Sequence, residues 1–86
     1  VDVDMSTEDI FQTMQELVAE HFEMDPEQVT MDTEFFDDLG ADSVDVVELI
    51  MSVEDAFEVG ETSEEVVATL KTVGDVVNYI ASKVAD

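Results

Sequence analysis

Residues 38–44 read DLGADSV and join a glycine turn to the start of an amphipathic helix. Gly40 permits a positive φ, which other residues adopt only at an energetic cost, so it suits a sharp turn. Asp42 is a favourable N-cap, and Asp45 adds negative charge to the first helical turn, at the positive end of the helix dipole. Ser43 is then expected at or beside the first helical position. The stretch therefore predicts an accessible serine hydroxyl in a well-defined place, unless the serine is only part of the cap.

The helix predicted over residues 43–57 carries two rows of apolar side chains. One row keeps the i, i+3, i+4, i+7 spacing of a face turned to a core, and consists of Val46, Leu49, Ile50, Val53 and Phe57. The second row is Val44, Val47 and Met51, flanked by Asp45, Glu48, Glu54 and Asp55. Apolar residues ringed by carboxylates suit a surface that docks a basic partner, and methionine is common on adaptable binding surfaces. The alternative is that Val47 or Met51 packs on a neighbouring helix.

Three further helices are predicted over residues 7–21, 63–69 and 72–84. Ser6 is a natural N-cap for the first of them, and the pairs Thr62–Glu65 and Thr72–Asp75 have the spacing of capping boxes. Apolar residues in these segments recur at helical spacing. The predicted fold is all-α, a small bundle of three long helices and one short helix. A chain of 86 residues holds a single domain, which we place at residues 6–86, after a tail at residues 1–5.

A long loop is predicted over residues 23–38, where the helical period breaks at Asp25-Pro26. Loops of this length are usually functional or held by their own packing. The loop is expected to be pinned across the bundle by three apolar side chains, Val29, Phe35 and Leu39. The pair Phe35-Phe36 has no basic residues beside it, which excludes a groove that stacks nucleic-acid bases.

The charge of the chain indicates which partners it can bind. It has 24 acidic and 2 basic side chains, a net charge of −22, which repels nucleic acid and anionic membranes and favours basic partners. Its 45% hydrophobic content with helical periodicity favours a folded chain over a disordered one, and a surface adapted to high salt is equally compatible. No stretch has the length of a membrane span, and the start lacks the features of a signal peptide. We expect a soluble monomer in the cytoplasm or in an organelle.

The residue inventory also limits the chemistry. The chain has no cysteine, so any thioester must use a thiol brought in on a cofactor. With one histidine, His21, and no basic residue near Ser43, there is little from which to build a nucleophile and its base, so we do not expect an enzyme. Metal binding by the lone His21 is not expected either. Carboxylates that crowd the start of helix 43–57 could share a weakly held Ca²⁺ or Mg²⁺ as loose screening: Asp37, Asp38, Asp42, Asp45 and Glu48.

Residues 38–49, DLGADSVDVVEL, resemble the prosthetic-group attachment segment of acyl carrier proteins, and the resemblance extends from Ser6 to Val84. It implies that Ser43, beside Asp42 in the same cofactor-binding segment, carries a 4′-phosphopantetheine arm added by a phosphopantetheinyl transferase. Acyl groups would travel on the terminal thiol of the arm as thioesters, and an acyl chain could fold back between the helices. The resemblance also implies that partner enzymes recognise one face of helix 43–57, namely Val44, Asp45, Val47, Glu48, Met51 and Glu54.

The chain departs from that family at two places. Its Asp42-Ser43-Val44 replaces the usual Asp-Ser-Leu, and the segment between Phe57 and Val73 lacks the usual proline and is about one residue longer. Three functions therefore stay open. The first is a carrier of fatty acyl chains for fatty-acid synthesis, and the second is a carrier of another cargo, such as a polyketide intermediate or an amino acid. The third is an acidic interaction module without an arm.

Overall fold

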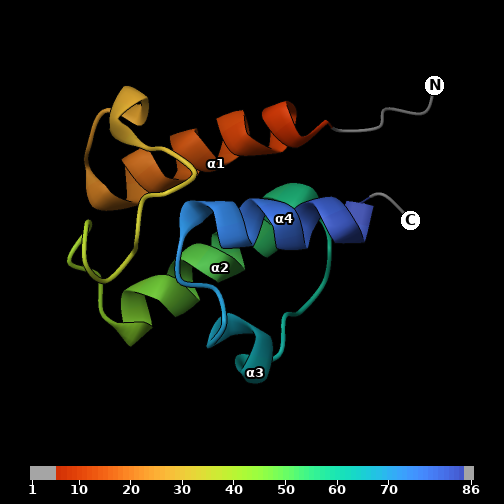
Figure 1. Ribbon diagram of the computed structural model, residues 1–86. Helices are drawn as coiled ribbons and strands as arrows, with labels where there is room; N and C mark the ends of the chain where they lie inside the picture. Colours follow the sequence, from red (N-terminus) through yellow and green to blue (C-terminus); the bar gives the residue numbers. More distant parts are fainter. Residues whose placement is uncertain (1–5, 85–86) are drawn as a thin grey trace.

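The computed structural model describes residues 6–84, which form four α-helices and one 3₁₀ turn (Figure 1). Helix α1 spans Thr7–Phe22, η1 Pro26–Gln28, α2 Ser43–Phe57, α3 Glu64–Val67 and α4 Val73–Val84. Helix α1 packs most extensively against α4 and also contacts α2, whereas the short α3 lies against α2. The predicted all-α bundle of three long helices and one short helix is confirmed. The tail predicted at residues 1–5 lies outside the described residues.

The long helices begin where their capping residues predict. Ser6 Oγ accepts a hydrogen bond from the Asp9 amide at 3.2 Å, and the Asp9 carboxylate accepts one from the Ser6 amide at 3.3 Å. Thr72 and Asp75 form the same reciprocal pair at the start of α4, at 3.0 and 3.2 Å. Each box satisfies backbone donors that the first helical turn leaves without partners. Helix α1 runs one residue past the predicted end at residue 21.

The predicted placement of the short helix is wrong at both ends. Ser63, not Thr62, is the N-cap of α3, and its hydroxyl accepts a hydrogen bond from the Val66 amide at 3.3 Å. The helix then stops at Val67, because the amides of Thr69 and Leu70 bond to carbonyls three residues back and tighten the chain into a turn. A single helical turn replaces the expected helix over residues 63–69.

The long first loop is tied to the start of α4 by backbone hydrogen bonds. The Val73 amide bonds to the Thr33 carbonyl at 2.9 Å, and the Gly74 amide bonds to the Met31 carbonyl at 2.8 Å. These loop carbonyls satisfy first-turn donors of α4. Residues 34 and 72 form an isolated β-bridge beside them. No local pattern in the sequence predicts this pairing.

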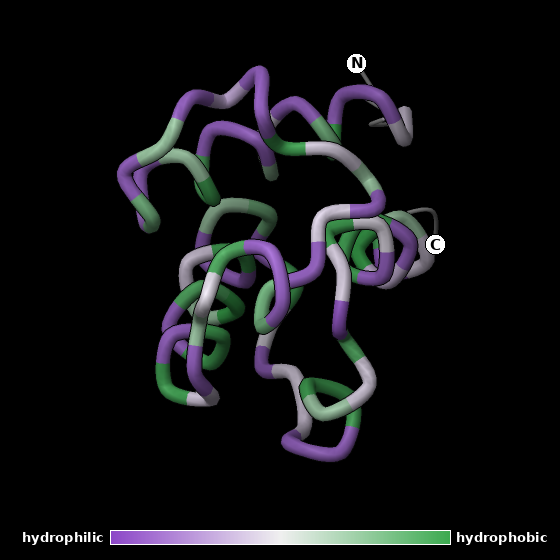
Figure 2. The backbone as a smooth tube through the Cα atoms, turned by 60° about the vertical axis from the view of Figure 1, so that its left-hand side comes forward, coloured by the Kyte–Doolittle hydropathy of each residue, from purple (hydrophilic) through white to green (hydrophobic). Residues whose placement is uncertain are grey.

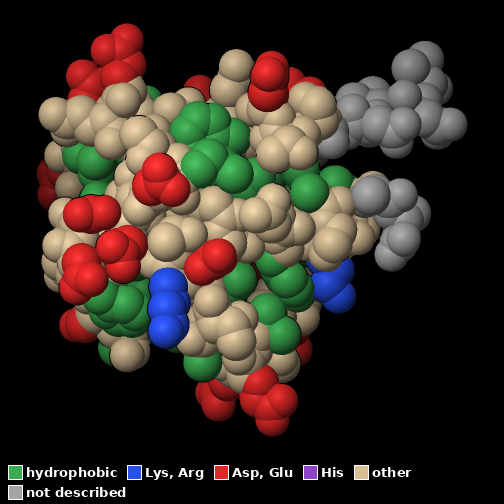
Figure 3. Space-filling model, in the orientation of Figure 1, with side chains coloured by type: hydrophobic (Ala, Val, Ile, Leu, Met, Phe, Trp, Pro, Cys, Tyr) green, Lys and Arg blue, Asp and Glu red, His purple; other side chains and the backbone are tan. Residues whose placement is uncertain are grey.

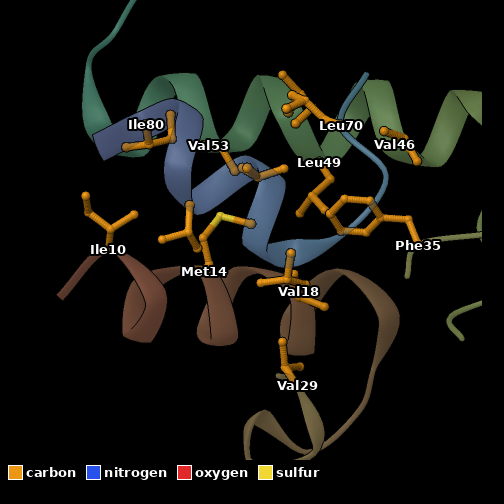
Figure 4. Close-up of a cluster of buried hydrophobic side chains, with 14 of the residues drawn as sticks. Ile10, Met14, Val18, Val29, Phe35, Val46, Leu49, Val53, Leu70 and Ile80 are labelled. Carbon is orange, nitrogen blue, oxygen red and sulfur yellow. The ribbon is translucent and has the colours of Figure 1, made fainter. Parts of the chain in front are cut away.

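The core is a single cluster of side chains from α1, α2, α4 and the loops. Figure 4 shows it filled from three sides, by side chains that include Ile10 and Met14 of α1, Leu49 and Val53 of α2, and Ile80 of α4. Val29 and Phe35 are buried in the same cluster and Leu39 is half-buried, which confirms the three predicted loop anchors. In Figure 2 hydrophobic and hydrophilic residues alternate along the helices, as expected where each helix buries one face.

Candidate functional site at the start of helix α2

Ser43 is the first residue of α2, and its side chain is exposed. The turn before it follows the sequence prediction, since Gly40 has a φ of 65°. Ala41 is buried, and its amide bonds to the Phe35 carbonyl at 2.9 Å, which fixes the turn to the loop that enters the core. The start of α2 is therefore held in place, with Ser43 at the surface.

A capping box of two aspartates forms the helix start. Asp42 Oδ1 accepts a hydrogen bond from the Asp45 amide at 2.9 Å, and Asp45 Oδ2 accepts one from the Asp42 amide at 3.2 Å. Asp42 is thus the N-cap and Ser43 lies one position inside the helix. Because Asp42 performs the capping, the hydroxyl of Ser43 is not needed for it.

A cavity of about 320 Å³ opens beside Ser43, between α2 and the segment that contains α3. It falls at the small end of the range of ligand cavities in proteins, ~300–1,000 Å³. Most of the wall is apolar, and the lining residues are Phe36, Ser43, Val46, Val47, Ile50, Thr62, Glu64, Val67 and Ala68. An apolar group attached at Ser43 would therefore find an apolar cavity next to its point of attachment.

The second apolar row of α2 lies at the surface. Val44 is 64% exposed, Val47 44% and Met51 61%. Val44 and Met51 therefore do not pack on a neighbouring helix, whereas Val47 shares its surface between solvent and the cavity wall. The exposed row has the properties of a binding surface.

The acidic residues around this row differ in their contacts. Glu48 is exposed, as is Asp55. Asp45 is half-buried in the capping box, and the half-buried Glu54 accepts a hydrogen bond from the Thr62 amide, which joins α2 to the chain entering α3. The hydroxyl of Thr62 is buried and has no hydrogen-bond partner within residues 6–84. Asp45 and Glu54 thus support the structure besides contributing negative charge.

The carboxylates predicted to screen cations do not form a preorganised site. Asp38 accepts a hydrogen bond from the Glu34 amide at 2.8 Å, while Asp42 and Asp45 bond to each other's amides. Across the described part of the chain, no group of three or more such side chains is arranged to hold a metal ion. Figure 3 shows acidic side chains spread over the visible face. Cation binding by diffuse screening remains a prediction.

Phe36 is the site residue that sequence reasoning missed. The sequence offers it no role beyond the excluded nucleic-acid stacking pair, yet it is 48% exposed and lines the cavity together with Ser43. The available signal was its position next to Phe35 in an otherwise polar turn, because a large apolar side chain exposed beside others can mark a binding site. Because Phe35 is buried, an exposed aromatic beside it required an explanation.

Comparison with known proteins identifies the family. Residues 12–80 match the family described as "Phosphopantetheine attachment site". The acyl carrier protein of Lactobacillus acidophilus is 45% identical over 78 residues, which is 91% of this chain and 96% of that protein. The acyl carrier protein of Exiguobacterium sibiricum is 45% identical over 80 residues, which is 93% of this chain and 100% of that protein.

The fold agrees with a solved structure from the same group. The acyl carrier protein of Enterococcus faecalis superposes with a TM-score of 0.76 at 37% identity, covering 92% of this chain and 99% of that chain. Within residues 6–84, no helix is long and apolar enough to cross a membrane. Because the family model matches most of its length and these similar proteins are acyl carrier proteins, the chain belongs to the acyl carrier protein family and contains its phosphopantetheine attachment domain.

Proposed function

We propose that this protein holds fatty acyl chains as thioesters on a 4′-phosphopantetheine arm joined to the Ser43 hydroxyl, and presents them to the enzymes of fatty-acid synthesis. The observation that carries the proposal is the position of Ser43, which is exposed at the start of α2 and lines an apolar cavity. Its hydroxyl is free for attachment, because Asp42 caps the helix. The arm supplies the thiol that a chain without cysteine lacks.

The residues around Ser43 fit a phosphodiester at this position. The first turn of α2 presents backbone amides and the positive end of the helix dipole, which favour a phosphate group. The capping box fixes the orientation of this turn, so the arm leaves the protein from a defined point. Asp42 and Asp45 add negative charge nearby, and a basic transferase surface would offset it.

The protein acts as a carrier, and its partners supply the catalytic groups. Basic surfaces on a phosphopantetheinyl transferase and on acyl-processing enzymes would dock on the acidic, apolar face of α2, formed by Val44, Asp45, Val47, Glu48, Met51 and Glu54. Apolar contact provides area, while the carboxylates steer and orient the partner. This role places the protein, as a monomer, in the cytoplasm or inside an organelle with the enzymes it serves.

One observation supports a second candidate cargo besides a fatty acyl chain. The cavity wall includes the polar Thr62 and Glu64 among its apolar residues, so an acyl group with oxygen substituents, such as a polyketide intermediate, would also find partners there. Mass spectrometry of the protein isolated from its own cells, after cleavage of the thioester, identifies the cargo.

Intact mass tests the attachment site. We expect the protein to gain the mass of one phosphopantetheine on incubation with coenzyme A and a broad-specificity phosphopantetheinyl transferase, or to carry it already. Ser43→Ala should show neither form, whereas Ser52→Ala, which removes another exposed serine of α2, should load normally. An unmodified parent protein, under conditions that load a known carrier, would leave Ser43 without this role and favour an unmodified acidic interaction module.

A further inference from the structure

The loop between η1 and α2, yellow to yellow-green in Figure 1, closes into a turn before it reaches Ser43. Asp38 Oδ2 accepts a hydrogen bond from the Glu34 amide at 2.8 Å, and the Asp38 amide donates one to the Glu34 carbonyl at 2.9 Å. The Leu39 amide also bonds to the Glu34 carbonyl, at 3.2 Å. Both backbone polar groups of Glu34 are thus bonded across the turn, and Asp38 is the side chain that closes it.

Phe35 connects this turn to two other parts of the chain. Its amide bonds to the Lys71 carbonyl at 3.0 Å, in the segment that precedes α4, and its carbonyl accepts the Ala41 amide at 2.9 Å. Its side chain is completely buried. Ala41 lies two residues before Ser43. The attachment turn is therefore joined to the core through the backbone that Asp38 holds.

Gly40 has the greatest backbone freedom in this segment, because it lacks a side chain. It adopts a φ of 65°, and a Cβ built on it would meet nothing within 4 Å. Packing on this side therefore does not support the Gly40 turn. The hydrogen bonds at Glu34 and Phe35, together with the buried Ala41, are what restrain it.

The capping box at the start of α2 does not by itself fix Ser43 relative to the core. The Asp42 and Asp45 carboxylates bond to each other's amides, so the box restrains residues 42–45 relative to one another. An N-cap keeps an extended backbone, as Asp42 does at φ −105° and ψ −178°, and helix ends fray easily. The hydrogen bond from Ala41 to Phe35 restrains the residue just before the cap. Loosening it would allow the first turn of α2 to fray, and Ser43 with it.

We propose that Asp38 is a positioning residue for the modification of Ser43, because its carboxylate closes the turn that holds Ala41 and so orients the hydroxyl. This inference rests on the proposed function. In that reaction Ser43 Oγ forms a bond to one phosphorus of the coenzyme A pyrophosphate, and the bond from that phosphorus to the bridging oxygen breaks. The adenosine bisphosphate leaves with the electron pair, and the hydroxyl proton passes to a base of the transferase. The rate of such a step depends steeply on how well the attacking oxygen is oriented.

The test compares Asp38→Ala with Asp38→Asn, which remove the same charge. Only asparagine keeps a side-chain oxygen that can accept the Glu34 amide. Phosphopantetheine transfer from coenzyme A by a purified transferase is followed by intact mass over a range of carrier concentrations. Asp38→Ala should lower kcat by on the order of fivefold, the factor that corresponds to one hydrogen bond of typical net strength. KM should change little, because the docking face of α2 is intact, and Asp38→Asn should keep a kcat close to that of the parent.

Two controls make the result specific to the turn. Asp32→Ala removes an exposed carboxylate from the same loop and should load like the parent. Amide hydrogen exchange, measured by NMR without transferase, should be faster at Glu34 and Ala41 in Asp38→Ala than in Asp38→Asn or the parent. Since Asp38 is exposed, both of its variants should fold. If Asp38→Ala does not, Asp38→Leu replaces it, because leucine is close to asparagine in size and has no acceptor.

The outcomes separate the two proposals. An unchanged kcat in Asp38→Ala, or an equal fall in Asp38→Ala and Asp38→Asn, would overturn the positioning role and leave the carrier function intact. A higher KM at unchanged kcat would also overturn it, since that result describes a docking contact. Failure of the parent to load at Ser43, under conditions that load a known carrier, would overturn the carrier function and the role of Asp38 with it.

Discussion

Gly74 lies where the first loop approaches α4 closely. Its amide bonds to the Met31 carbonyl at 2.8 Å, and a Cβ built on Gly74 would lie 2.8 Å from that same oxygen. Real Cβ atoms essentially never come so close to another atom. A glycine in the first turn of a helix normally costs up to about 1 kcal/mol relative to alanine. Here the missing side chain allows the loop to reach the helix.

Gly74→Ala should therefore destabilise the protein although alanine is the better helix former. We expect a loss of about 1–3 kcal/mol in the free energy of unfolding, the usual range for overpacking in a place that cannot relax freely. Chemical denaturation followed by circular dichroism measures it. Asn78→Ala is the matched control, since Asn78 is exposed on the same helix and should gain a few tenths of a kcal/mol. Equal stability of Gly74→Ala and Asn78→Ala would contradict the close approach.

Helix α2 is the element that joins the core to the site. Its buried residues, including Leu49 and Val53, fix it in the bundle, while Val44 and Met51 remain at the surface. The N-terminal capping box orients Ser43, and Glu54 holds the chain that leads into α3. One helix therefore places the proposed attachment point, the cavity wall and the proposed partner-facing row in a fixed relation. This rigidity is what a carrier needs in order to present its arm to several enzymes.

The docking role of α2 predicts a position-dependent effect of charge reversal. Glu48→Lys should lower kcat/KM for phosphopantetheinyl transfer by on the order of fivefold, because it places a positive charge where a basic partner is steered. Glu16→Lys changes the net charge equally at an exposed position of α1 and should have a smaller effect. Met51→Ala should also lower kcat/KM, through lost apolar contact. Unchanged loading of both Glu48→Lys and Met51→Ala would exclude this face as the interface.

The whole molecule carries a strong and unbalanced charge. The net charge is −22 on 86 residues, and the only basic side chains, Lys71 and Lys83, are both exposed. Self-repulsion of this size opposes the compact state. The folded protein depends on apolar packing to overcome it, since the chain has no cysteine with which to form a disulfide.

Salt should consequently stabilise the protein. We expect the melting temperature to rise with NaCl and to rise at millimolar Mg²⁺, because cations screen or bind among crowded carboxylates. Thermal denaturation at fixed pH, with NaCl and MgCl₂ compared at equal ionic strength, separates diffuse screening from direct binding of the divalent ion. A melting temperature that does not respond to millimolar Mg²⁺ would contradict the shared cation binding near the start of α2.

The sequence by itself determined the all-α fold and the attachment segment. Helical periodicity, the caps at Ser6, Asp42 and Thr72, and the glycine turn at Gly40 are local signals, and each depends on residues only a few positions apart. The same locality explains why α2 was placed correctly over residues 43–57. Val29, Phe35 and Leu39 are predictable as loop anchors because burying apolar side chains can pin a long loop, although the sequence does not show that Phe36 of the same loop stays at the surface.

Only the tertiary structure decided the extent of α3, the pairing of the first loop with α4, and the cavity beside Ser43. Each involves residues distant in sequence: Glu54 holds Thr62 just before α3, the Gly74 amide bonds to the Met31 carbonyl, and Phe36 and Val67 line the same cavity. A single turn such as α3 has too few hydrogen bonds of its own to be fixed by local preference, so its neighbours set its limits. A cavity likewise has no sequence pattern, because it is the space that several packed elements leave between them.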